Sequence, residues 1–203
     1  MKIKKYIQFV KESTGYDYGC VMVEVPVSNW NEICSVIDKD DIYEEENDTS
    51  YGIQENPHLT LLYGLKSDVS KEKVEDILEN IMDEWRNFGM EDFDYNDVSD
   101  RIAIEDASDK GIEIEIENIG VFENEKFDVV KFNIKKTELL QKLFDGLSEL
   151  PNENTFPDYK PHMTIAFVKK GLGEKYKKKY SHKVSSNEIC YSMANGEKVY
   201  FEI

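Results

Sequence analysis

Two short motifs supply the residues of this chain whose types and spacing could do chemistry. Each consists of a proline, a histidine, a bulky apolar residue, a threonine and an aliphatic residue, and together they contain His58 with Thr60 and His162 with Thr164. A single histidine on an apolar strand is most often a core residue. Two of the chain's three histidines in one pattern are harder to explain by packing, and we predict that these four side chains form one catalytic site.

The chemistry that this set of residues suits is the cleavage of a phosphodiester. A neutral imidazole can accept the proton of an attacking hydroxyl while an imidazolium protonates the leaving oxygen, because the unperturbed pKa of histidine is about 6.5. The threonine hydroxyls can donate hydrogen bonds to the non-bridging phosphate oxygens. This scheme needs no cofactor and no metal, and threonine is a poor zinc ligand. We therefore predict acid–base catalysis without a metal site.

Strands are the elements that would position these side chains. Alternate residues of a strand face the same side, so we expect His58 and Thr60 to share one face while Leu59 and Leu61 face the other. The second motif has the same alternation. The four functional side chains would converge on one cleft if the two strands lie side by side.

The remaining pattern divides the chain into two halves of similar order. Each half offers a strand, a helix with an apolar stripe, and then the strand that carries the motif. Strands are predicted over residues 18–27, 57–65, 101–105, 112–117, 127–134, 162–168, 189–193 and 198–203, and helices are predicted to begin near residues 28, 70 and 137. The acidic segments 38–48 and 88–100 are predicted to be loops. The 203 residues suffice for one sizeable core, or for two small lobes that share one.

Charge and composition restrict the partners of the chain. The formal net charge of −17 disfavours long nucleic acid, which is bound through lysine and arginine. A small anion in a local positive pocket is still compatible with this charge, because salt screens distant charges beyond roughly 8 Å. The apolar runs are too short to span a membrane, and no apolar stretch that would make a signal peptide follows the basic N-terminus. The three cysteines suggest buried free thiols, so we expect a cytoplasmic protein.

One basic segment stands out in this acidic chain. Residues 169–183 contain seven lysines and one glutamate. The segment is either a solvated helix or loop, or a flap that steers an anionic ligand toward His162. The third histidine, His182, lies in this segment, and we expect it to be exposed without a catalytic role.

The two motifs resemble the signature of the 2H phosphoesterase superfamily, which includes cyclic phosphodiesterases and the so-called 2′,5′-RNA ligases. Over residues 18–65, the sequence resembles one branch of the superfamily in particular, the phage branch represented by anti-CBASS protein 1. This resemblance rests there on segments that include Gly19-Cys20-Val21-Met22-Val23, Tyr51-Gly52-Ile53 and Pro57-His58-Leu59-Thr60-Leu61-Leu62-Tyr63-Gly64-Leu65. It is confined to the second motif later in the chain, where Ala166-Phe167-Val168 lacks the glycine that ends the first.

The resemblance implies an α+β fold in which residues 1–203 form one bilobal domain, with an antiparallel sheet and outer helices in each lobe around a central cleft. It implies a metal-independent phosphodiesterase that cleaves the 3′,5′ bonds of cyclic di- or trinucleotides used in bacterial anti-phage immunity, in the cytoplasm of the bacterial host. The family's catalytic residues carry over onto His58, Thr60, His162 and Thr164. An aromatic residue ahead of the first strand, Tyr18 or its neighbour Tyr16, is expected to stack on a base.

Two other functions remain open at this point. An RNA-end enzyme would act on 2′,3′-cyclic phosphates or on 2′,5′ bonds. A nucleotide sponge would bind the small cyclic nucleotide without cutting it, although such a protein has no need of two proton-transfer groups. The sequence does not predict the oligomeric state, the base preference, or which histidine is the base.

Overall fold

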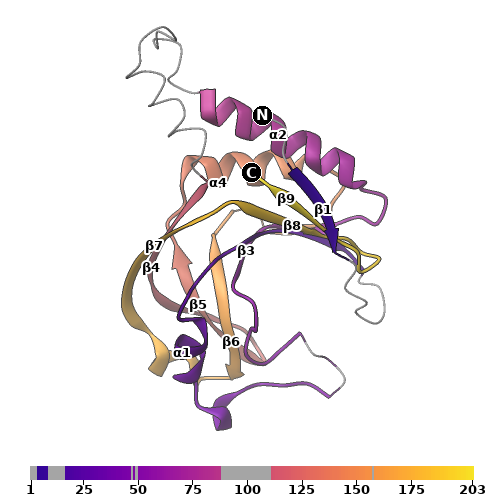
Figure 1. The fold of residues 1–203 in the computed structure, drawn as a ribbon. Coiled ribbons are helices and arrows are strands. Elements are labelled where there is room, and N and C mark those ends of the chain that lie inside the picture. The colour runs from indigo at the N-terminus through magenta and orange to yellow at the C-terminus, as the bar shows by residue number, and fades with distance from the viewer. Residues whose placement is uncertain (1–3, 9–16, 47, 49, 88–110, 157) are drawn as a thin grey trace, which may run out of the picture.

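The computed structural model describes residues 4–8, 17–46, 48, 50–87, 111–156 and 158–203. These residues form two antiparallel sheets with a few helices, an α+β fold (Figure 1). The strands are β1 (Lys4–Gln8), β2 (Gly19–Glu24), β3 (His58–Leu65), β4 (Ile112–Glu123), β5 (Phe127–Ile134), β6 (His162–Lys169), β7 (Lys178–Ser186), β8 (Glu188–Ser192) and β9 (Lys198–Glu202). The first sheet has the strand order β1-β9-β8-β2-β3, and the second has the order β6-β5-β4-β7. The fold class predicted from the sequence is confirmed.

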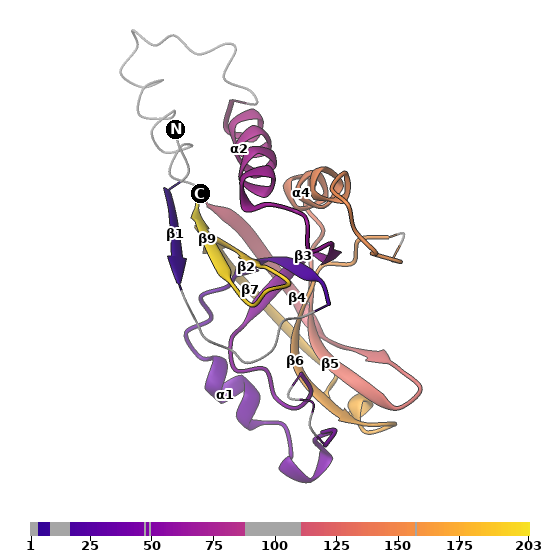
Figure 2. The ribbon, with the colours of Figure 1, turned by 90° about the vertical axis from the view of Figure 1, so that its right-hand side faces the viewer.

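The helices begin close to where their apolar stripes predict. They are α1 (Trp30–Ser35), α2 (Lys71–Asn87) and α4 (Glu138–Ser148), with two short 3-10 helices, η1 (Lys39–Asp41) and η2 (Gly173–Tyr176). Thr137 caps α4 by accepting a hydrogen bond from the backbone of Leu140 at 3.3 Å. Two views show α2 and α4 side by side, with α1 at the opposite end of the molecule (Figures 1 and 2). None of the helices in the described ranges is long and apolar enough to cross a membrane.

A single hydrophobic core runs through both sheets. Buried aliphatic side chains of β2 and β3, such as Val23 and Leu59, belong to the same cluster as Phe132 of β5 and Ile165 of β6. Separating the sheets would expose apolar surface on both of them, and each Å² of buried apolar surface contributes about 25 cal/mol. The shared core therefore couples the stability of the two sheets.

The two strands that carry the motifs, β3 and β6, are edge strands of their sheets, and they contact each other. Residues 42–43 and 52–54 of the first half pair with the free edge of β6, where the Tyr43 N–H donates to Phe167 O at 3.0 Å and the Gln54 N–H donates to Ile165 O at 2.9 Å. In return, the Glu153 N–H donates to Gly64 O of β3 at 2.9 Å. Each motif strand is therefore held by backbone hydrogen bonds from both halves of the chain.

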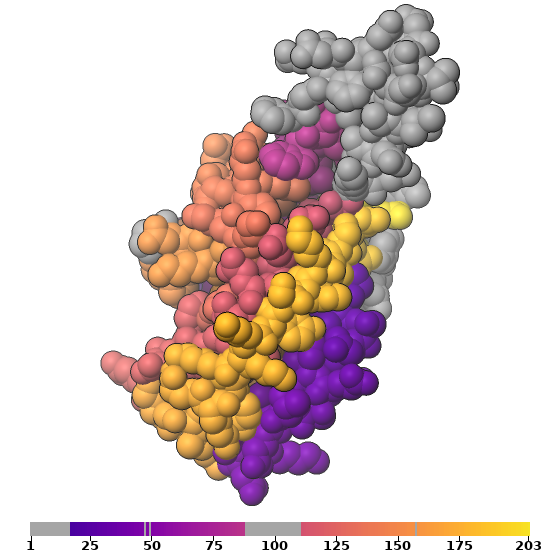
Figure 3. All heavy atoms as spheres, turned by 90° about the vertical axis from the view of Figure 1, so that its left-hand side faces the viewer, coloured from indigo at the N-terminus to yellow at the C-terminus, as the bar shows by residue number. Residues whose placement is uncertain are grey.

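Several local predictions need correction. Residues 38–48 are not a simple exposed loop, because they contain η1 and the buried Asp41, which accepts hydrogen bonds from Tyr176 and Lys175. The basic segment 169–183 contains η2 and the first part of β7, so it is not one continuous helix or loop. Most of its residues are exposed, and its role as a flap stays a prediction. A space-filling view shows this part of the second half lying against the first half (Figure 3).

Other boundaries differ less from the predictions. The strand predicted over residues 112–117 extends to Glu123 as β4, and Gly64 lies within β3 instead of ending it. Gly64 has a φ of 94°, and a Cβ there would come within 3.1 Å of the Asn154 backbone nitrogen, which explains why this position needs glycine. The loop predicted over residues 88–100 and the strand predicted over residues 101–105 fall outside the described residues.

Candidate active site

The two motifs occupy equivalent positions at the starts of β3 and β6. His58 and Thr60 are half-buried, while Leu59 and Leu61 between and after them are buried. β6 repeats this alternation, with His162 and Thr164 half-buried and the next residue after each of them buried. Each histidine therefore shares one strand face with its threonine, as the sequence predicts.

Both histidine rings are anchored to the backbone in the same way. His58 Nδ1 lies 3.0 Å from Asn56 O, and His162 Nδ1 lies 2.8 Å from Lys160 O. A carbonyl oxygen can only accept a hydrogen bond, so this geometry assigns the neutral ring's proton to Nδ1. Nε2 of each ring then has its lone pair available for proton transfer.

The surroundings of both rings lower their pKa values. Burial lowers the pKa of His58, the bond to Asn56 opposes this effect, and the positive charge of Lys198 lowers the pKa further. Burial also lowers the pKa of His162, with smaller lowering effects from the charges of Lys131 and His58. The rings thus lie within electrostatic range of each other, and protonating one makes it harder to protonate the other. One neutral and one protonated imidazole is the pair of states that acid–base catalysis requires.

Lys131 of β5 was missed by the sequence reasoning. It pairs with Thr164 in the register of β5 and β6, so its side chain shares the face of the motif. It is 4% exposed and donates a hydrogen bond to the Asn133 side chain. Its Nζ lies 3.8 Å from the centroid of the Phe122 ring, which also packs edge-on against His162 at 4.9 Å between ring centroids. The signal available in the sequence was a lysine inside the apolar run 129–132.

The first sheet supplies different neighbours to its own motif. Glu24 pairs with His58 and Met22 pairs with Thr60, in the positions that Asn133 and Lys131 take opposite the second motif. Burial and the nearby charge of Glu188 raise the pKa of Glu24. The site is therefore symmetric in its histidines and asymmetric in its charges, with the buried cation on the side of the second motif.

Tyr18, the predicted base-stacking residue, lies at the other end of β2 from His58. It precedes Met22, the partner of Thr60, by four residues, which corresponds to roughly 13 Å along a strand. Its ring packs edge-on against Tyr63 at 6.2 Å between centroids. A stacking role for Tyr18 stays a prediction, and the alternative Tyr16 falls outside the described residues.

A cluster of half-buried aromatic rings lies farther along β6 from Thr164. It consists of Tyr43, Tyr51, Phe127 and Phe167, with ring centroids 5.1–5.4 Å apart for each contacting pair. The sequence reasoning did not identify this cluster, because its members come from three segments that only the fold brings together.

Among the remaining reactive side chains, Cys20 reaches the site through a hydrogen bond with Thr60. His182 is exposed on β7, as predicted. The three cysteines are free thiols, and burial raises the pKa of Cys20 and of Cys190 to about 12, so these thiols stay protonated at neutral pH. Within the described ranges, no three histidine, cysteine or acidic side chains lie close enough together to hold a metal ion.

Comparison with known proteins identifies the family that this geometry resembles. The family model described as the 2′-5′ RNA ligase superfamily matches residues 25–182. The structure of Usb1 from Kluyveromyces marxianus is similar with a TM-score of 0.53 at 9% identity, covering 93% of this chain and 99% of that chain. Escherichia coli LigT complexed with 3′-AMP gives a TM-score of 0.51 at 13% identity, covering 92% of this chain and 95% of that chain. The comparison with curated proteins gives no match.

Proposed function

The chain belongs to the 2′-5′ RNA ligase superfamily, the 2H phosphoesterases, and on this premise we propose that it is a metal-independent phosphodiesterase of small cyclic di- or trinucleotides. The observation that carries the proposal is the matched anchoring of two histidines, with Nδ1 of His58 and of His162 held by a backbone carbonyl. Two equivalent proton-transfer groups on facing edge strands suit a reaction in which one proton is removed and another is delivered.

The proposed reaction uses the ribose 2′-hydroxyl beside a 3′,5′ linkage as the nucleophile. Nε2 of one histidine accepts the hydroxyl proton as the bond between O2′ and phosphorus forms. Nε2 of the other histidine, in its protonated state, donates a proton to O5′ as the bond between phosphorus and O5′ breaks. Thr60 and Thr164 donate hydrogen bonds to the non-bridging oxygens, where negative charge develops. The product is a 2′,3′-cyclic phosphate. Because both rings are anchored alike, each is competent in either role.

Charge supports a small substrate. The chain carries a formal net charge of −17, so a long polyanion would meet repulsion over most of the surface. The solved relatives include Usb1 with uridine monophosphate and LigT with 3′-AMP, which are small nucleotides bound by those proteins. The further assignment to cyclic signals of anti-phage immunity, in the cytoplasm of a bacterial host, rests on the resemblance of residues 18–65 to the phage branch of the superfamily.

A test of this proposal combines a substrate panel with three histidine variants. We expect the wild-type protein to consume one or more cyclic di- or trinucleotides in EDTA, with products identified by mass. His58→Ala and His162→Ala should each lower kcat by about 10²–10⁴-fold, the usual contribution of a general acid or base. His182→Ala removes the exposed histidine and should retain full activity. Near-normal turnover by either motif variant would contradict the mechanism.

An RNA-end activity is the second candidate function, and the description of the matching family as a 2′-5′ RNA ligase superfamily favours it. Cleavage of 2′,5′-linked oligoribonucleotides or opening of RNA 2′,3′-cyclic phosphates, with cyclic dinucleotides left intact, would establish this activity in place of the first. A sponge would instead release every cyclic nucleotide unchanged after prolonged incubation.

A further inference from the structure

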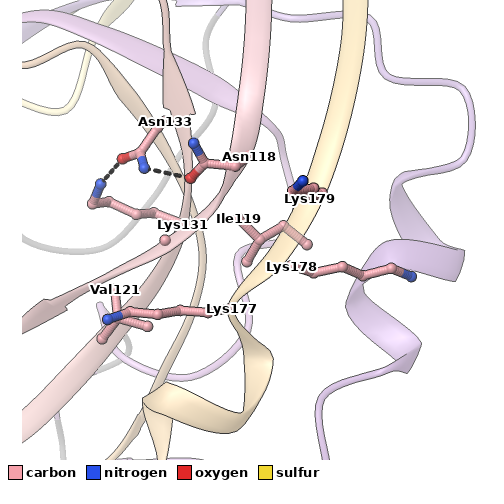
Figure 4. Close-up of a pocket in the computed structure, with 9 residues that line it drawn as sticks. Asn118, Ile119, Val121, Lys131, Asn133, Lys177, Lys178 and Lys179 are labelled. Carbon is pink, nitrogen blue, oxygen red and sulfur yellow. Dashed lines mark hydrogen bonds between the residues drawn. The ribbon is translucent and has the colours of Figure 1, made fainter.

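A pocket of about 560 Å³ opens beside the candidate active site, where β7 diverges from β4 (Figure 4). Pairing between these strands ends at Ile119 and Lys178, while β4 continues to Glu123. The pocket is lined by side chains from β4, β5 and the start of β7. They include one buried lysine, Lys131, and several lysines that are exposed.

The floor of this pocket contains a chain of hydrogen bonds, which we call the Lys131 network. Lys131 Nζ donates to Asn133 Oδ1, and Asn133 Nδ2 donates to Asn118 Oδ1 at 2.6 Å (Figure 4). Gly120 makes room for it, because a Cβ at that position would lie 2.6 Å from Asn133 Nδ2. The absence of a side chain at Gly120 is therefore part of the construction of the network.

The network contains a buried cation without a matching carboxylate. Among the described residues, no carboxylate forms an ion pair with Lys131, whose side chain is 4% exposed. Burial lowers the pKa of Lys131 to about 8, which is the effect expected when an ammonium group loses water without gaining an anion. An anionic group of a ligand would supply the missing charge partner and make charge-assisted hydrogen bonds.

The network extends from the motif toward the rim of the pocket. Asn133 pairs with His162, Asn118 pairs with Asn133, and Lys179 of β7 pairs with Asn118. Neighbouring strands are about 4.8 Å apart, so Asn118 lies roughly 10 Å from His162 across the sheet. Lys179 forms no ion pair with the described residues and is exposed at the rim.

We propose that the Lys131 network, with Lys179 at its rim, is a subsite for a second phosphate of the substrate, next to the phosphate that is cleaved. This inference rests on the proposed function and narrows it to nucleotides that carry at least two phosphates, such as a cyclic dinucleotide. The first sheet has Met22 and Glu24 at the corresponding positions, and the cation near His58, Lys198, also lies near the carboxylate of Glu24. The second phosphate therefore binds on the side of the second motif, and the asymmetry fixes the direction in which the substrate lies.

The test compares two substrates that share one scissile 3′,5′ bond. A dinucleoside monophosphate contains a single phosphate, whereas a cyclic dinucleotide contains two. For the cyclic dinucleotide, we expect Lys131→Met to raise KM by about tenfold or more, since hydrogen bonds to charged groups contribute about 1.5–3 kcal/mol. Lys179→Ala should raise it by about two- to fivefold, as expected for an exposed charge. Lys179→Ala, which lies outside the catalytic residues, should leave KM for the dinucleoside monophosphate unchanged.

Lys178→Ala is the matched control, because it removes the same charge from the adjacent position. Figure 4 shows the Lys178 side chain pointing away from Lys131 and Asn133. This variant should behave as wild type with both substrates. Equal losses with both substrates, or equal effects of Lys178→Ala and Lys179→Ala, would overturn the proposed subsite. Lys179 is exposed, so its substitution tests the subsite without disturbing the core.

The failure of the proposed function would give a different result. If the wild-type protein cleaves neither substrate, calorimetric titration with the cyclic dinucleotide still tests the subsite. Weaker binding to Lys179→Ala than to Lys178→Ala would support it. Equal binding to both variants, or binding to neither of them nor to wild type, would overturn it.

Discussion

At the scale of single residues, the two candidate histidines share a backbone anchor and differ in their neighbours. His162 contacts the Phe122 ring, and the charge of Lys131 lowers its pKa. His58 pairs with Glu24 across the sheet, and the charge of Lys198 lowers its pKa. The anchor assigns both tautomers, and the neighbours adjust how readily each ring binds a proton. Proton transfer at this site should therefore depend on pH in a way that Lys131 influences.

The pH profile of kcat/KM tests this dependence. Both histidine pKa values are lowered from the unperturbed value of about 6.5. Because activity requires one neutral and one protonated ring, kcat/KM should be highest at a pH below about 6.5. Lys131→Met removes a positive charge that lowers the pKa of His162, so the maximum should move to higher pH. The dinucleoside monophosphate is the appropriate substrate, because the proposed second-phosphate subsite does not affect it. A wild-type maximum on the alkaline side of neutrality would contradict the assignment.

At the scale of elements, the basic segment is held in place by a buried carboxylate. Asp128 of β5 is 1% exposed and accepts hydrogen bonds from the backbone N–H groups of Gly171 and Gly173 at 2.8 and 3.0 Å. Lys170 Nζ also donates to it at 3.3 Å. These bonds fix the turn before η2, and through it the start of β7. The segment is thus anchored at its N-terminal end, ahead of the residues Lys177, Lys178 and Lys179 that line the pocket.

Replacing this carboxylate should destabilise the protein. Asp128→Ala leaves two backbone donors without their acceptor, and we expect a loss of about 2–4 kcal/mol in the free energy of unfolding, since each unsatisfied buried donor costs about 1–3 kcal/mol. Urea unfolding measures the change. Asp145→Ala, which removes an exposed carboxylate bonded to Gln141 on α4, is the control and should stay within about 0.5 kcal/mol of wild type. Similar stabilities for the two variants would refute the anchoring role.

At the scale of the whole molecule, the halves are joined by more than the chain connection. The ring of Trp30 in α1 lies 6.3 Å from that of Phe132 in the second sheet, and the Gln54 N–H, whose carbonyl accepts the indole N–H of Trp30 at 2.8 Å, donates to Ile165 O of β6. The buried core is one cluster that includes residues of both sheets. The two lobes should therefore behave as one cooperative unit.

Equilibrium unfolding tests this unity. We expect a single transition, in which tryptophan fluorescence from Trp30 and Trp85 and the far-ultraviolet circular dichroism change at the same urea concentration. Trp30→Ala should lower that midpoint for the whole protein, with a loss of about 3–5 kcal/mol from the cavity it leaves. Two separated transitions in the wild-type protein would show instead that the lobes unfold independently.

The sequence predicted those features that depend on local pattern. The alternation around His58 and His162 predicted two strands with functional faces, and the apolar stripes of α2 and α4 predicted both helices. β7 escaped prediction because most of its side chains are exposed, so it lacks the alternation of buried and exposed residues that marks a strand. The neighbours of the motifs could not be predicted either. The pairing of Lys131 with Thr164 depends on register across a sheet, which no single segment encodes.

The reciprocal pairing of the motif strands also protects the protein from aggregation. An unpaired strand edge is a template for another chain. The bridges from Ile42 to Val168 and from Ile53 to Ala166 close the edge of β6, and the bridge from Leu65 to Asn152 closes part of the edge of β3. Each half thus covers the motif strand of the other half, whose edge could otherwise pair with another chain. A fragment containing only one half would expose an apolar edge at the strand that bears its histidine, so self-association would accompany any loss of the other half.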